Sequence, residues 1–212
     1  MTTVTDGSNR CWAFPRLHAQ FLLYGRKVNN MALTRKQYDE AKKRTLEYFD
    51  KASIVLTDKE KENIEVADFG LSKLDKVGVQ LNIYVNTERC SAKEVILFPG
   101  QICPEHLHPD IDGKQGKEET FRCRWGEFYL YVKGPATANP KAKVPEEMKE
   151  HFTVWHEIVL KPGDQYLVSP NTLHWFQAGP EGAVLSEFST KNVDEMDIFT
   201  DPNIKRIPEI IE

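Results

Sequence analysis

The chain has 212 residues, of which 40% are hydrophobic and 28% are charged, and this balance fits one ordinary globular domain with a sizeable core. Its formal net charge is -4 and its Lys and Arg residues are scattered, so the basic surface that nucleic acid requires is missing. No apolar run approaches the roughly 20 residues of a membrane-spanning helix, and the N-terminus lacks a signal-peptide pattern, so we expect a cytoplasmic protein without a membrane partner.

The first well-formed helix signal follows directly after Met31. Residues 1–30 show no convincing period, and we interpret them as an N-terminal extension that can lie upstream of the natural start, with 31–212 as a single domain. Thr34 and Gln37 form a capping box. One apolar face is then predicted by residues that recur at helical spacing, namely Tyr38, Ala41, Thr45, Tyr48, Phe49 and Ala52.

From about residue 79 the pattern changes to short runs rich in β-branched and aromatic residues, separated by Gly, Pro, Asn or Asp. These runs are VQLNIYV, KEVILF, EFYLYV, TVWHEIVL, QYLV, LHWFQA and AVLSEF. They predict an antiparallel sandwich or barrel. The segment KGPATANPKAKVPEEMKEH, residues 133–151, is charged and rich in Pro, which predicts a surface excursion.

The cysteines show no pairing pattern. Cys11, Cys90, Cys103 and Cys123 form no CxxC motif, and in a reducing compartment we expect them to be small buried apolar residues rather than disulfides or zinc ligands.

Metal-ligand chemistry is concentrated in the stretch GQICPEHLHPDIDGKQGKEETFRCRWG, residues 100–126. In a strand, His106 and His108 would present both imidazoles to one side. Glu119 alternates in step with Phe121 and Cys123, so it is predicted to point inward, whereas Glu118 points outward. A carboxylate among apolar side chains needs a cation or strong hydrogen bonds, and a metal shared with the histidines would meet that need.

The spacing of these residues resembles the cupin superfamily. Gly100 precedes five residues and then His106-x-His108, Glu119 precedes six residues and then Gly126, and PGDQYLVSPNTLHWFQAG supplies the later His174. Ten residues separate His108 from Glu119 where cupins have three or four, which implies a longer hairpin. The resemblance implies a jelly-roll-like β-barrel, dominated by β-structure and flanked by N-terminal α-helices. It also implies that one metal ion is bound inside the barrel by His106, His108, Glu119 and His174.

Three longer runs resemble the D-lyxose ketol-isomerase family from about residue 34 onward. They are CSAKEVILFPGQICPEHLHP, GKEETFRCRWG and the tail SEFSTKNVDEMDIFTDPNIKR, of which the tail is the most specific. This resemblance implies an isomerase that interconverts D-lyxose and D-xylulose, with D-mannose and D-fructose as related substrates, and that uses Mn2+ or a similar ion. The ligand types also suit Co2+, Ni2+, Fe2+ and Zn2+ and cannot select among them.

An aldose-ketose isomerisation through an enediol needs a base near the carbon and a stabiliser of charge on oxygen. Glu187 is the first choice for the base, because Leu185, Glu187 and Ser189 share one face of the strand that follows His174. A structural glutamate is the alternative. Lys93 precedes the apolar run VILF and is the predicted cationic partner, with a lysine extending from a strand end to solvent as its alternative.

The remaining polar candidates are in the tail. Arg206, Asp197 and Asp201 are predicted to contact sugar hydroxyls, with solvated loop residues as the alternative. Ordinary packing explains Tyr129 and Tyr131 better than a role in the cavity. No role is assigned to the histidines without a partner at ligand spacing, which are His18, His151 and His156.

Two other functions fit parts of the pattern. A cupin dioxygenase would need iron and oxygen and a more apolar cavity than Lys93, Glu187 and Arg206 suggest. A non-catalytic sugar-binding cupin would bind without turnover. We expect a small-molecule sugar as partner, without phosphate because no Lys/Arg cluster lies near the motifs, and a homodimer.

Overall fold

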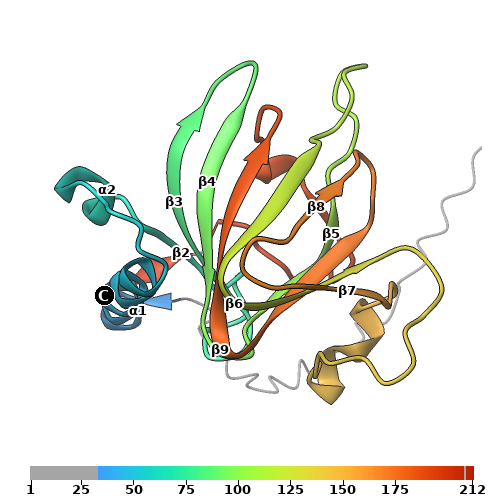
Figure 1. The fold of residues 1–212 in the computed structure, drawn as a ribbon, viewed down its shortest axis with the longest axis horizontal. Coiled ribbons are helices and arrows are strands. Elements are labelled where there is room, and N and C mark those ends of the chain that lie inside the picture. Colours follow the sequence, from blue (N-terminus) through green and yellow to red (C-terminus); the bar gives the residue numbers. More distant parts are fainter. Residues whose placement is uncertain (1–32, 208) are drawn as a thin grey trace, which may run out of the picture.

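The computed structural model describes residues 33–207 and 209–212, and these form a curled β-barrel with helices on its outside (Figure 1). The cupin-type, jelly-roll-like fold class predicted from the sequence is confirmed. The main strands are β2 (Glu65–Ala67), β3 (Val79–Asn86), β4 (Ser91–Leu97), β5 (Ile102–Leu107), β6 (Glu119–Val132), β7 (His156–Leu160), β8 (Gln165–Val168), β9 (His174–Ser189) and β10 (Ile198–Phe199).

The barrel consists of two halves that share the long strands β6 and β9. One half has the order β2-β3-β4-β9-β6-β8 and uses residues 183–189 of β9. The other half has the order β10-β5-β9-β6-β7 and uses residues 174–178 of β9. All of these neighbours are antiparallel, so the two halves face each other across one interior.

Both long strands bend where one half passes into the other. The register between β6 and β9 shifts near Gly126, whose φ is 77°. A Cβ atom there would lie 2.1 Å from the carbonyl oxygen of Gly182, which itself has a φ of 97°. Only glycine allows this approach and this backbone conformation. The runs LHWFQA and AVLSEF, predicted as separate strands, are therefore parts of the one continuous, bent strand β9, and EFYLYV is the second part of the bent strand β6.

The predicted N-terminal helix is confirmed as α1 (Arg35–Lys51), with Thr34 and Gln37 forming the capping box. Its buried side chains Ala41, Thr45, Tyr48 and Phe49 belong to the predicted apolar face. A short helix, α2 (Asp58–Glu62), follows it, and two-residue strands β1 (Leu33–Thr34) and β11 (Ile210–Ile211) pair in parallel. No helix among the described residues is long and apolar enough to cross a membrane.

The predicted surface excursion at 133–151 is wrong in one respect. Its side chains Ala142, Val144 and Met148 are buried and belong to the main core. The segment contains a 3-10 helix, η1 (Glu146–His151), and backbone hydrogen bonds of Lys143 to the side chain of Gln177 on β9 hold it to the barrel. Proline and charge marked it as irregular but did not reveal that it closes one side of the core.

Three of the four cysteines lie in the described residues. Cys103 and Cys123 are buried and free, as predicted, whereas Cys90 is exposed in the turn between β3 and β4, so the prediction of a buried residue is wrong there. Cys11, His18 and the proposed start at Met31 lie outside the described residues.

Candidate metal centre and active site

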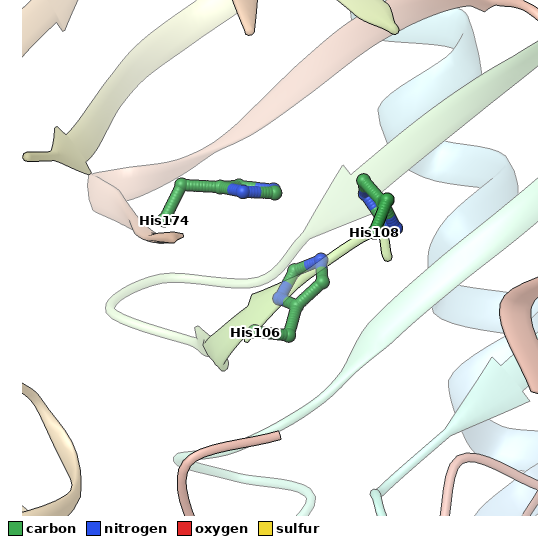
Figure 2. A group of neighbouring side chains, drawn as sticks. All are labelled: His106, His108 and His174. Carbon is green, nitrogen blue, oxygen red and sulfur yellow. The ribbon is translucent and has the colours of Figure 1, made fainter. Parts of the chain in front are cut away.

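Three imidazoles meet inside the barrel. His106 is on β5, His108 follows directly after β5, and His174 begins β9, where it is the cross-strand partner of His106. One ligand atom from each lies within 4.8 Å of the others, and all three side chains are buried. Figure 2 shows the three rings gathered from the two strands. The His-x-His alternation therefore places both rings on one side, as predicted.

The far nitrogen of each ring is held by an acceptor. His106 Nδ1 lies 2.8 Å from the carbonyl oxygen of Pro104, and His174 Nδ1 lies 2.9 Å from that of Thr172. His108 Nδ1 lies 2.6 Å from Oδ1 of Asp197. Each Nδ1 donates its proton to these oxygens, because neither a carbonyl nor an ionised carboxylate has one to give, and the Nε2 atoms are thereby the nitrogens available to a metal ion.

Glu119 supplies the carboxylate. It is buried at the start of β6, and Glu118 is exposed, so the strand-phase prediction is confirmed. Glu119 Oε1 lies 3.2 Å from His108 Nε2 and 2.9 Å from His174 Nε2. The buried His174 Nε2 nevertheless has no hydrogen-bond partner of acceptable geometry. Two ligand atoms of one octahedral ion with bonds of about 2.1 Å lie about 3 Å apart, so this donor set fits a divalent ion.

A second acidic group, Glu187, lies between two lysines. Lys93 on β4 is the cross-strand partner of Glu187 on β9, and its Nζ lies 3.2 Å from Oε1 of the glutamate. Nζ of Lys117 lies 3.1 Å from the same oxygen and 2.8 Å from Oε2 of Glu119. All three side chains are buried. Lys117 therefore links the candidate base to the candidate ligand set.

Sequence reasoning missed Lys117. It stands two residues before Glu119, and the alternation that turned Glu119 inward would have turned Lys117 inward as well if it had been extended one step upstream. A buried lysine needs a carboxylate partner, and Glu119 was already predicted to be buried.

The tail contributes a further ion pair. Asp194, in the 3-10 helix η2 (Asp194–Met196), approaches Lys93 to 3.7 Å and pairs with the guanidinium of Arg206. Arg206 and Asp197 both line the cavity, and Asp197 also holds His108. The third predicted tail residue does not line it: Asp201 accepts a hydrogen bond from the backbone N–H of Asn203 at 2.8 Å.

Burial and pairing decide the charges of these groups. Burial, reinforced by His174 and His108, holds the pKa of His106 well below its usual range, so the ring is neutral. Burial opposes the charge on Lys117, but the carboxylates of Glu119 and Glu187 outweigh it and raise its pKa. Burial likewise opposes the charge on Asp194, yet Lys93 and Arg206 hold its pKa below the usual range. The site is a set of paired charges.

The inner cavity opens beside a second, outer pocket. Most residues of 108–117, together with Lys191, Val193, Met196 and Asp197, line the outer pocket, which shares His108, Lys117 and Asp197 with the inner cavity. The unusually long interval between His108 and Glu119 therefore forms one side of this outer pocket.

Four residues weighed from the sequence do not line the cavity. Tyr131 stacks on Trp175 with ring centroids 4.0 Å apart, and Tyr129 donates to Glu127, so both serve packing as expected. His156 lies 3.1 Å from the carbonyl oxygen of Pro135, and His151 lies 3.7 Å from Asp201.

The chain is similar to known sugar isomerases in sequence. The family model described as D-lyxose isomerase matches residues 53–212. The D-lyxose ketol-isomerase of Thermofilum sp. (strain ex4484_79) is 61% identical over 84% of this chain and 99% of its own length. The D-lyxose/D-mannose isomerase of Thermosediminibacter oceani is 59% identical over 84% of this chain and 98% of its own.

The fold is also found in a solved sugar isomerase. The L-ribose isomerase of Acinetobacter sp. DL28 in complex with L-ribose superposes with a TM-score of 0.69 at 16% identity, covering 86% of this chain and 99% of that one. This likeness concerns the fold. The family match and the two relatives, together with the buried site they cover, show that the chain belongs to the D-lyxose isomerase family of sugar isomerases.

Proposed function

We propose that the protein is a metal-dependent isomerase that interconverts D-lyxose and D-xylulose, and also D-mannose and D-fructose, by enediol proton transfer. The names of the two relatives support this substrate range. The observation that carries the proposed mechanism is a buried carboxylate, Glu187, that lines the same cavity as His106 and His108 and contacts two buried ammonium groups. A carboxylate in that setting can reach a substrate carbon without being a metal ligand.

His106, His108, His174 and Glu119 would hold the ion, with Mn2+ as the first choice and Co2+, Ni2+, Fe2+ or Zn2+ as alternatives. When bound, the ion polarises neighbouring sugar oxygens as a Lewis acid. The chain keeps three of these ligands in a fixed tautomer through Pro104, Thr172 and Asp197.

Glu187 then moves the proton. It accepts the proton from C2 of the open-chain aldose, and the electron pair of that bond becomes the C1–C2 double bond of the enediol. The π electron pair of C1=O moves to O1, which takes up the proton that O2 gives up. As C2=O forms, the electron pair of the C1–C2 double bond takes back at C1 the proton that Glu187 holds. The ammonium groups of Lys93 and Lys117, each close to Glu187, donate hydrogen bonds to the oxygens where negative charge develops.

Arg206 and Asp197 are the proposed contacts for the sugar hydroxyls, because both line the cavity. The outer pocket, which shares Asp197 with the cavity, gives the far end of the sugar a path to solvent. Asp201, which does not line the cavity, is left out of this proposal.

The test is conversion by protein loaded with one metal at a time and incubated with a panel of aldoses and ketoses, followed by product analysis. We expect D-lyxose and D-xylulose to interconvert. Oxygen consumption without any conversion would instead favour the iron-dependent dioxygenase, and sugar binding without turnover would favour the non-catalytic cupin. The charged interior, with Lys93, Lys117 and Glu187, supports the isomerase over the dioxygenase.

The proposed homodimer is supported by an apolar row on the outer face of the sheet. Val85, Phe188 and Leu167 are exposed there and lie on strands joined by the pairs Val85–Ala92, Ala92–Phe188, Phe188–Thr120 and Thr120–Leu167. Exposed apolar rows of this kind mark association surfaces. Light scattering after size-exclusion chromatography should give a dimer mass for the wild type and a lower mass for Leu167→Glu.

A further inference from the structure

We propose that Asn192 is a positioning residue that sets the two lysines of the site around Glu187, a role that rests on the function proposed above. Asn192 lies in the loop between β9 and η2 and is 9% exposed. It does not line the cavity, so it acts through the lysines and not on the sugar.

The side-chain oxygen of Asn192 faces both ammonium groups. Its Oδ1 lies 3.4 Å from Nζ of Lys93 and 3.2 Å from Nζ of Lys117. Oε1 of Glu187 lies 3.2 Å and 3.1 Å from the same two atoms. The two cations therefore share two acceptors, one charged and one neutral. Without the neutral acceptor, the two ammonium groups would share only Glu187, and Asp194 and Glu119 would draw Lys93 and Lys117 toward different carboxylates.

The chemistry of an amide suits this place. An ammonium group is only a donor, so the atom that faces both lysines must be the oxygen of the amide. Asn192 thus accepts from two cations without adding a negative charge to the site, which neither a carboxylate nor an aliphatic side chain can do.

Asn192 is itself held by a second asparagine. Asn86, the last residue of β3, donates from Nδ2 to the carbonyl oxygen of Asn192 at 3.0 Å and accepts from its backbone N–H at 3.1 Å. This reciprocal pair fixes the backbone of a loop residue against the end of a strand. A chain of hydrogen bonds therefore runs from β3 through Asn86 and Asn192 to Lys93 and Lys117. Support of this kind keeps reacting groups in their productive geometry.

The experiment compares two substitutions of similar shape in metal-loaded protein. Asn192→Asp keeps an oxygen for the lysines, and Asn192→Leu removes it. Asn63→Leu, at the exposed end of α2, is the matched control. Each variant is assayed for kcat and KM with D-lyxose, metal content and melting temperature. In a second arm without sugar, brief acetylation followed by peptide mass spectrometry measures the reactivity of Lys93 and Lys117.

We expect Asn192→Leu to lower kcat on the order of tenfold or more, with a smaller change in KM and with metal retained, because hydrogen bonds to charged groups are lost. It should also raise the acetylation of both lysines severalfold. Asn192→Asp should keep the lysines protected, and Asn63→Leu should match wild type. Should Asn192→Leu fail to fold, Asn86→Ala, which removes both bonds to the Asn192 backbone, should give the same changes more weakly.

Wild-type acetylation of both lysines in Asn192→Leu would overturn the proposal, and so would equal losses of kcat in the Asp and Leu variants. A wild-type protein that converts no sugar would refute the proposed function instead. The acetylation arm would then still decide whether Asn192 positions the lysines, since it needs no turnover.

Discussion

The interior of the barrel has a charged end and an apolar end on the same strands. Lys93 of β4 pairs with Glu187 of β9 in one cross-strand row, and only two residues further along the same strands Val95 pairs with Leu185. The next row brings Leu97 against Ala183. The interior therefore changes from an ion pair to apolar side chains between two successive inward-facing residues of each strand. The two ends contribute differently to the molecule.

The apolar end stabilises the fold, whereas the charged end is stable only because its charges are paired. Fully burying an aliphatic side chain contributes about 1.5–3 kcal/mol, and Val95, Leu97 and Leu185 are all buried. A buried ion pair contributes little after desolvation. Substitutions that keep the charge pairing at the charged end should therefore change chemistry more than stability, and substitutions at the apolar end should do the reverse.

The largest expected effect at the charged end comes from removing a metal ligand. His174→Ala should lower metal content to near background and abolish activity, because its Nε2 is one of the three gathered nitrogens. Metal analysis by mass spectrometry and an isomerase assay measure both. His156→Ala, which removes a histidine outside the cavity, should keep metal and activity, and loss of metal there would show that the site has been placed wrongly.

Removing only basicity should separate chemistry from binding. Glu187→Gln keeps the size of the side chain but not its basicity, so we expect kcat to fall on the order of 10²-fold or more with metal retained. Glu118→Gln, on the exposed side of the strand start, should behave as wild type. Normal turnover by Glu187→Gln would place the base elsewhere.

The opposite result is expected at the apolar end. Leu97 is completely buried in the main core, and Leu97→Ala should lower the free energy of unfolding by about 2–5 kcal/mol, since it removes buried carbon and leaves a cavity. Below the melting temperature of the variant, metal content should stay near that of wild type. Chemical denaturation measures the free energy of unfolding, and mass spectrometry measures the metal content. Loss of metal without loss of stability would contradict the division between the two ends.

The smallest effect is expected from Asp197, which contacts a metal-ligand residue and is not itself a predicted ligand. Asp197→Asn keeps an oxygen near His108 Nδ1 but removes its charge, and metal affinity should fall about tenfold. Competition with a fluorescent chelator measures this affinity. Asp201→Asn, outside the cavity lining, should leave the affinity unchanged, and equal losses in the two variants would argue against a specific role for Asp197.

Much of this site is predictable from the sequence because alternate residues of a strand face the same side of the sheet. The spacing of His106 and His108 and the phase of Glu119 indicate which side chains share the interior. Glu187 follows from the same rule and Lys93 from its place before the apolar run VILF, and the two prove to be cross-strand partners. The density of short β-rich runs predicts an antiparallel sandwich or barrel, whereas the jelly-roll-like cupin class and the place of His174 in the ligand set are what the resemblance to cupins implies.

The remaining parts depend on long-range contacts that no local pattern encodes. Asn192 and Asp194 stand in a tail without period, and only the folded chain brings them to Lys93. Asp201 lies in the same tail, but its side chain accepts a hydrogen bond from the backbone of Asn203 in a local turn. The bend that joins the two predicted runs of β9 depends on the contact of Gly182 with Gly126, two residues far apart in the sequence.

Turnover in D2O tests the central claim most directly. If Glu187 carries the C2 proton to C1, it can exchange that proton with solvent during part of the cycle, and NMR or mass analysis of the D-xylulose formed from D-lyxose should show deuterium at C1. The account predicts this label. Complete conversion with C1 free of deuterium would mean that hydrogen moves directly between the two carbons, and it would contradict the role of Glu187 as the base.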